Sequence, residues 1–149
     1  MKKLFFLAAV AFLPSIASSQ KMKASFDHIG ILVNDLDKSR AFYLRIIQLD
    51  TIPNPWPGQR TTWFSLGDHL QFHLMEEKEK KFCIPLFNHL CFSVSSVDAF
   101  IEKLNQEHIE FTNAEGKPNA ITNLRADNVK QIFLKDPDGY VVEINDRKH

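Results

Sequence analysis

Four side chains with metal-binding chemistry occupy segments whose alternating apolar residues predict β-strands. His28 lies in D-H-I-G-I-L-V and His89 in N-H-L-C-F-S-V, each on the face opposite to three apolar residues of its strand. His73 lies in L-Q-F-H-L-M, and Glu143 lies in Y-V-V-E-I-N. We therefore predict that His28, His73, His89 and Glu143 form one metal site.

Three neutral imidazoles and one carboxylate suit a borderline divalent ion such as zinc, iron, nickel, cobalt or manganese. A six-coordinate ion would keep two adjacent positions open, and a substrate with neighbouring oxygens could occupy both. The ion would then stabilise a developing enolate or alkoxide as a Lewis acid. Glu143 is the candidate catalytic base. The predicted chemistry is proton transfer beside a carbonyl of a small molecule.

A single histidine on a strand is more often a hydrogen-bonded structural residue than a ligand, so the prediction rests on all four positions together. Gln71 shares the face of His73 and is an alternative to it at that position. The candidate substrate contacts are Trp63, as an aromatic wall, Gln71, and Arg60 and Arg125, for an anionic group.

The elements that position these residues occur twice along the chain, each time as a strand, a helix and further strands. Apolar spacing predicts one helix from an N-cap at Asp37 to about Gln48 and a second from Val97 to His108. Asp136-Pro137-Asp138-Gly139 predicts a turn into the Glu143 strand. The predicted strands are residues 27–33, 61–66, 70–75, 88–94, 109–112, 129–134 and 140–145.

We therefore predict the α+β class, with tandem β-α-β-β-β modules that form a cupped mixed or antiparallel sheet with the helices outside. Module one would span residues 26–76 and module two residues 88–146, within a single domain over residues 24–149.

These motifs resemble the vicinal oxygen chelate superfamily, which includes glyoxalase I, methylmalonyl-CoA epimerase, extradiol dioxygenases and the fosfomycin- and bleomycin-resistance proteins. The resemblance rests on the two histidine strands, on Phe42-Tyr43 and on D-P-D-G-Y-V-V-E-I, and it extends from Phe26 to Asp146. It implies a glyoxalase-like fold in which each half gives two metal ligands from matching strands.

The resemblance implies a metal-dependent lyase or isomerase, glyoxalase- or epimerase-like, that acts on a small substrate with vicinal oxygens. Glyoxalase I usually carries a carboxylate where this chain has His73, so its pair of glutamates for proton shuttling is absent here. Two alternatives stay open: a metal-free protein that sequesters a small molecule, of the bleomycin-resistance type, and an iron(II) extradiol-type dioxygenase. The ligand pairs would meet either within one chain or across a homodimer.

Residues 1–19 have the features of a secretory signal peptide: two lysines, a short apolar run, a proline and a tail of small residues. The apolar run is too short to span a bilayer as a stable helix. After cleavage we expect a secreted or periplasmic protein without a stable membrane span.

The charge balance argues against nucleic acid as a partner. Loss of Lys2 and Lys3 with the signal peptide leaves 16 basic against 18 acidic residues, a net charge of −2, without a basic run. Cys83 and Cys91 are the only cysteines; export would permit a disulfide, but their spacing favours two independent thiols and leaves their pairing open.

Overall fold

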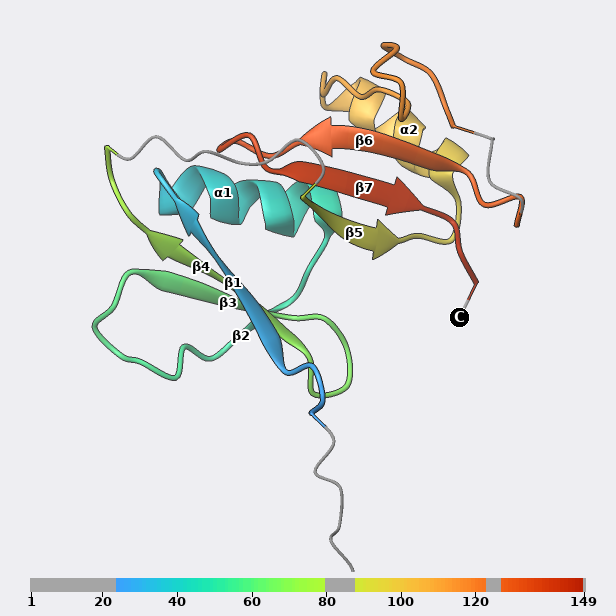
Figure 1. Ribbon diagram of the computed structural model, residues 1–149. Helices are drawn as coiled ribbons and strands as arrows, with labels where there is room; N and C mark the ends of the chain where they lie inside the picture. The colour runs from blue at the N-terminus through green and yellow to red at the C-terminus, as the bar shows by residue number, and fades with distance from the viewer. Residues whose placement is uncertain (1–23, 80–87, 123–126, 149) are drawn as a thin grey trace, which may run out of the picture.

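The computed structural model describes residues 24–79, 88–122 and 127–148, which form two β-sheets and two helical segments (Figure 1). The predicted signal peptide, Cys83 and Arg125 lie outside these residues. The strands are β1 (His28–Val33), β2 (Thr51–Ile52), β3 (Thr61–Ser65), β4 (Gln71–Glu76), β5 (His89–Ser93), β6 (Gln131–Lys135) and β7 (Val141–Asn145). The helices are α1 (Leu36–Phe42), which continues as a turn of π-helix, η1 (Tyr43–Ile47), and α2 (Val97–Gln106).

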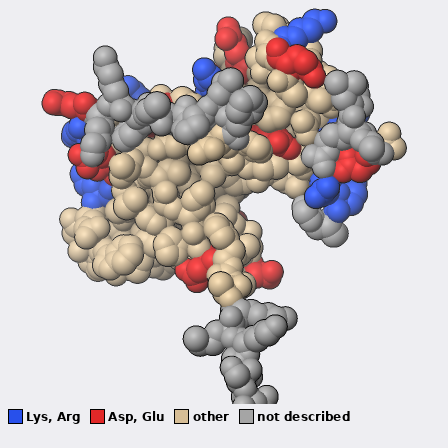
Figure 2. All heavy atoms as spheres, viewed as in Figure 1, with Lys and Arg blue, Asp and Glu red and all other residues tan. Residues whose placement is uncertain are grey.

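Each module forms its own mixed sheet. Sheet A has the strand order β1-β4-β3-β2, with β1 and β4 parallel and the other pairs antiparallel. Sheet B has the order β5-β7-β6, with β5 and β7 parallel. The surface over sheet A in the view of Figure 2 consists mostly of residues other than Lys, Arg, Asp and Glu. The predicted α+β fold with a duplicated module is confirmed.

The first helix begins two residues before its predicted start, and the N-cap prediction of Asp37 was wrong. Asp35 is the N-cap, because its backbone is extended and its carboxylate accepts a hydrogen bond from the Lys38 N–H at 3.1 Å. Asp37 lies in the first turn, where its charge meets the positive end of the helix. Among the described residues, neither helical segment is long and apolar enough to cross a bilayer.

Two short strands differ from the prediction. β2 was not located in the sequence; it ends before Pro53, which lacks the N–H that a longer ladder would need. The predicted strand over residues 109–112 is reduced to a single bridge residue, Thr112, which exchanges backbone hydrogen bonds with Phe133 at 2.8 and 2.9 Å and also pairs with Pro118. The chain then folds back, and Thr122 takes the next pairing position, opposite Gln131.

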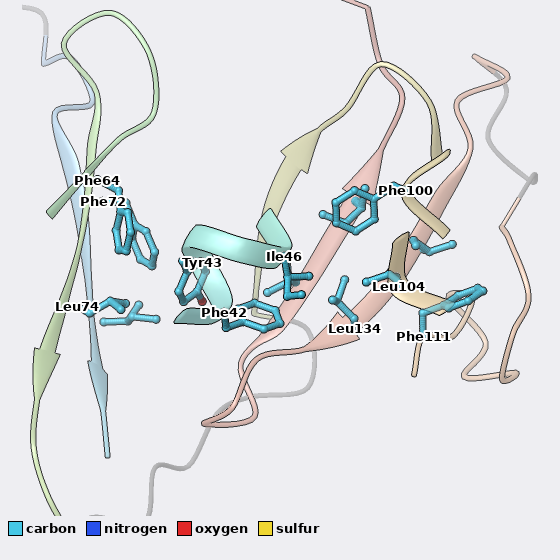
Figure 3. Close-up of a cluster of buried hydrophobic side chains, with 14 of the residues drawn as sticks. Phe42, Tyr43, Ile46, Phe64, Phe72, Leu74, Phe100, Leu104, Phe111 and Leu134 are labelled. Carbon is cyan, nitrogen blue, oxygen red and sulfur yellow. The ribbon is translucent and has the colours of Figure 1, made fainter. Parts of the chain in front are cut away.

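One hydrophobic core joins the two modules (Figure 3). Tyr43 is fully buried, and its ring lies 4.8 Å from Phe72 and 6.0 Å from Phe64 of sheet A. On the other side of the same helical segment, Ile46 lies toward Leu134 in Figure 3 and belongs to the same core. The α1–η1 segment therefore lies between sheet A and module two, as Figure 1 also shows.

The turn between β6 and β7 fastens the modules together, with carboxylates that had been predicted only as turn residues. Asp138 accepts hydrogen bonds from the Ser39 hydroxyl at 2.6 Å and from the backbone and side-chain nitrogens of Asn34 at 2.8 and 3.1 Å. Asp136 accepts one from the Tyr43 hydroxyl at 2.9 Å. Burial raises the pKa of Asp136, and the hydrogen bond from Tyr43 opposes that rise. We call these contacts the module clamp.

Removal of one clamp hydroxyl tests its contribution to stability. Tyr43→Phe keeps the ring in the core but leaves buried Asp136 without this donor, so we expect a loss of about 1–3 kcal/mol in the free energy of unfolding. Urea denaturation at neutral pH measures the loss. Arg45→Ala, which removes a solvent-exposed ion pair with Glu107, is the control and should cost much less. Equal midpoints for the two variants would contradict a stabilising clamp.

Candidate metal centre

His28 and His73 lie together on the face of sheet A that points away from the core. Their ring centroids are 5.4 Å apart. The parallel register of β1 and β4 places Gly30 opposite His73, and a Cβ on Gly30 would lie 2.5 Å from Cε1 and Nε2 of that imidazole. The glycine therefore gives the His73 ring the space to lie over β1, beside His28.

The two imidazoles differ in hydrogen bonding and in exposure to solvent. His28 Nδ1 is 2.6 Å from the Asp27 carboxylate, which leaves Nε2 as the nitrogen that would bind a metal. His73 is 5% exposed, and its Nδ1 is buried without a hydrogen-bond partner. Burial lowers the pKa of His73, and neighbouring His28 lowers it further. His73 is thus held in the neutral form that metals require.

A tryptophan covers the other side of His73. Trp63 lies opposite His73 in the antiparallel register of β3 and β4, and the two rings stack with centroids 4.1 Å apart and planes 12° from parallel. Trp63 is also 5.9 Å from the His28 ring. The predicted aromatic wall is therefore in contact with the His28–His73 pair.

His89 and Glu143 form the second pair, on sheet B. His89 Nε2 is 3.2 Å from Glu143 Oε2, so the two atoms that would bind a metal face each other. The other carboxylate oxygen, Oε1, accepts a hydrogen bond from Asn145 Nδ2 at 3.1 Å. Asn145 is itself held by the Ser93 hydroxyl, which donates to Oδ1 at 2.9 Å. The Glu143 carboxylate is thereby oriented, with one oxygen directed at His89.

The two pairs lie on opposite sides of the core. Phe72 and Leu74 of β4 face the core, so His73 between them points the other way; Val142 and Ile144 of β7 flank Glu143 in the same manner. Among the described residues, no three His, Cys, Asp or Glu side chains come close enough together to hold a metal ion. The structure brings the predicted ligands together in twos, one pair per module.

The structure also describes the surroundings of two further predicted substrate contacts, Gln71 and Arg60, and of Cys91. Gln71 is half-buried, in register with His28. Arg60 binds Glu76 through Nε at 2.6 Å and through its terminal nitrogen at 3.0 Å, so its charge is already compensated. Cys91, in register with Glu143, accepts a hydrogen bond from Asn145 at 3.1 Å.

Sequence reasoning missed the residues that orient the candidate ligands. Asp27 directly precedes His28, and the D-H doublet was a usable signal for a carboxylate on the ring. Asn145 lies two residues after Glu143, hence on the same face of the strand.

Comparison with known proteins agrees with this architecture. A family model described as Glyoxalase/Bleomycin resistance protein/Dioxygenase superfamily matches residues 25–144. Glyoxylase I 4 of Arabidopsis thaliana is 28% identical over 80% of this chain and 69% of its own length. Metallothiol transferase FosB of Staphylococcus epidermidis is 27% identical over 81% of this chain and 80% of its own length.

Solved structures share the fold. The fosfomycin resistance protein FosX of Listeria monocytogenes, crystallised with manganese(II) and sulfate, superposes with a TM-score of 0.64 at 20% identity. The match covers 85% of this chain and 95% of that one.

The close fit between Gly30 and His73 generates a prediction. Gly30→Ala places a methyl group where the imidazole lies, so we expect the ring to move into solvent and the pKa of His73 to rise toward its usual value. NMR titration of the histidine ring signals measures this shift. Leu32→Ala, on the same face of β1, is the control and should leave the pKa of His73 unchanged. An unshifted His73 signal in Gly30→Ala would show that the fit is not tight.

Proposed function

The chain belongs to the Glyoxalase/Bleomycin resistance protein/Dioxygenase superfamily, and we propose that it is an exported, metal-dependent lyase or isomerase acting on a small molecule with vicinal oxygens. The observation that carries the proposal is the pair of half-sites, His28 with His73 and His89 with Glu143. Each half-site lies on the outward face of its sheet and has a polar residue that orients one ligand.

The donor set fits one divalent transition metal. The unpartnered Nδ1 of buried His73 and the facing Nε2 and Oε2 atoms of His89 and Glu143 are what a nitrogen- and oxygen-ligated ion would satisfy. Zinc, iron, nickel, cobalt and manganese are all compatible with three imidazoles and a carboxylate. When bound, the ion would supply Lewis-acid stabilisation of the negative charge that develops on a substrate oxygen.

A second copy of the chain would complete the site. Closure of the two half-sites within one chain would require breaking the shared core and the module clamp. A two-fold dimer can instead place sheet A of one copy against sheet B of the other, and symmetry then creates two equal sites. We therefore favour a homodimer with composite sites.

Glu143 would move the proton. Its side chain is nearly buried, so water competes little for its carboxylate. Asn145 holds Oε1, so Oε2 would serve as the base only when it is partly detached from the metal; it would then take the proton from the carbon beside the substrate carbonyl and return it to a neighbouring atom. This action needs one base only, consistent with an imidazole in place of a second carboxylate at His73.

Export is part of the proposal. It rests on the basic start, the apolar run and the small-residue tail of residues 1–19. The mass of the chain recovered from the medium or periplasm tests it; full-length protein confined to the cytoplasm would contradict export.

A second candidate function has one observation in its favour. Trp63, which stacks on His73, and the neighbouring Trp56 could hold an aromatic molecule without any metal, as a sequestering protein would. This candidate requires that His89→Ala and Glu143→Ala leave ligand affinity intact.

A mixing experiment tests the composite metal site. His28→Ala/His73→Ala and His89→Ala/Glu143→Ala each destroy one half-site, so each variant alone should hold less than about a tenth of an equivalent of zinc. After exchange of subunits, about half of the dimers are mixed and each has one complete site, so about a quarter of the native zinc content should return. Mixed dimers that bind no zinc would contradict a site shared between copies.

Hydrogen exchange tests the reaction class. When metal-loaded protein is incubated with acetoin in D₂O, deuterium should replace the hydrogen on the hydroxyl-bearing carbon of acetoin, beside the carbonyl, as read by NMR. Glu143→Gln should slow this exchange by about 100-fold or more, because the base is lost. Glu102→Gln, an exposed carboxylate of α2, is the control and should keep the native rate. Oxygen uptake with a catechol, without any exchange, would favour ring cleavage instead.

A further inference from the structure

Trp56 is a large apolar side chain at the surface beside the candidate half-site of sheet A. Half of the residue is exposed. The backbone N–H of Trp56 donates to the Asn54 side-chain oxygen at 2.8 Å, and the backbone carbonyl of Trp56 accepts from the Gln59 N–H at 3.2 Å. The Asn54 side-chain amide donates to the Gln59 carbonyl at 3.3 Å. Three prolines in this loop restrict the backbone further. These contacts hold the backbone at Trp56 in place.

Trp56 extends a row of rings that begins at the predicted metal ligands. Its centroid is 5.4 Å from Trp63, which stacks on His73, which in turn neighbours His28. We call Trp56 and Trp63 the tryptophan wall. A flat molecule bound at the half-site would meet an aromatic surface continuous with the ligand imidazoles.

Buried polar atoms accompany this wall. Trp63 Nε1 and Thr61 Oγ1 are buried without a hydrogen-bond partner, and Trp63 is only 4% exposed. Thr61 and Trp63 are two residues apart on β3, so their side chains leave the same face of the sheet. Buried donors without partners are rare in native proteins, and here they lie beside a candidate ligand site.

The charges around the wall are already compensated. Arg60, next to Thr61 in the sequence, is bound to Glu76 and lies 3.5 Å from Asp37. The surface over sheet A in Figure 2 is largely free of charged side chains, which gather at its borders. An ionic group would gain little here and would lose its hydration.

We propose that the tryptophan wall binds an uncharged, flat, unsaturated group of the substrate, such as an aromatic ring, while the vicinal oxygens reach the metal. Trp56, the exposed member of the wall, would stack on the ring of the substrate. This inference rests on the proposed function and adds the chemical class of its substrate.

The chain offers a direct readout, because its two tryptophans are both in this wall. Intrinsic fluorescence of the zinc-loaded full chain therefore reports on this place alone. Three probes are titrated: phenylacetylcarbinol, acetoin, in which a methyl group replaces the phenyl ring, and the para-carboxylate of phenylacetylcarbinol.

We expect phenylacetylcarbinol to change the fluorescence and to bind about tenfold more tightly than acetoin, from ring burial and stacking. The para-carboxylate should lose most of that gain. Trp56→Ala should reduce the phenyl-to-methyl preference to less than about threefold. Phe26→Ala, which removes the other large exposed aromatic residue among those described, is the matched control and should keep the preference.

Three results would overturn the inference. Equal, zinc-dependent affinities for phenylacetylcarbinol and acetoin would show that the tryptophan wall does not contribute to substrate binding. The proposed function would be unaffected by that result. No binding of either ketol by the zinc-loaded protein would overturn both. A Trp56→Ala chain that falls apart into monomers in light scattering, with its phenyl preference unchanged, would assign Trp56 to the contact between copies.

Discussion

The packing of one helical segment, α1–η1, between sheet A and module two governs the rest of the structure. The Tyr43 ring packs against Phe72 of sheet A, and its hydroxyl donates a hydrogen bond to Asp136 of module two, so one side chain contacts both modules. Asp138 repeats this connection through Ser39 and Asn34. Because each sheet turns its apolar face to this shared core, the ligand faces must point outward. The separation of the two half-sites is therefore a consequence of how the core is built.

Strand periodicity explains why the members of each candidate ligand pair could be predicted from sequence to lie on the same side of a sheet. A period of two places His73 opposite to Phe72 and Leu74 regardless of the tertiary arrangement, and a parallel neighbour then brings His28 alongside. The same logic applies to Glu143. The distance between the pairs has no such local signal, since it depends on what the helices pack against. The strand face of each of the four residues can therefore be predicted without deciding whether they form one site or two separate half-sites.

Features that depend on a single side-chain contact were harder to predict. Asp35 and Asp37 are both suitable N-caps by residue type, and only the extended backbone at Asp35 decides between them. Arg60 has the charge expected of an anion-binding residue, but Glu76 on the neighbouring β4 takes up that charge. The place of Trp56 depends on hydrogen bonds within a proline-rich loop that has no periodic pattern. Such contacts become visible only in three dimensions.

The buried polar atoms in the core differ from those on the outward face of sheet A, which carries the candidate ligands. On the core side, buried Ser39, Tyr43 and Asp136 all have hydrogen-bond partners. The buried side-chain atoms without a partner among the described residues belong to Thr61, Trp63 and His73, all on the outward face. A chain that satisfies its polar groups so completely on one face has no folding reason to leave three unsatisfied on the other. These atoms lie beside the His28–His73 pair, where a metal ion or a substrate would have to displace the side chains that cover them before it could supply their partners.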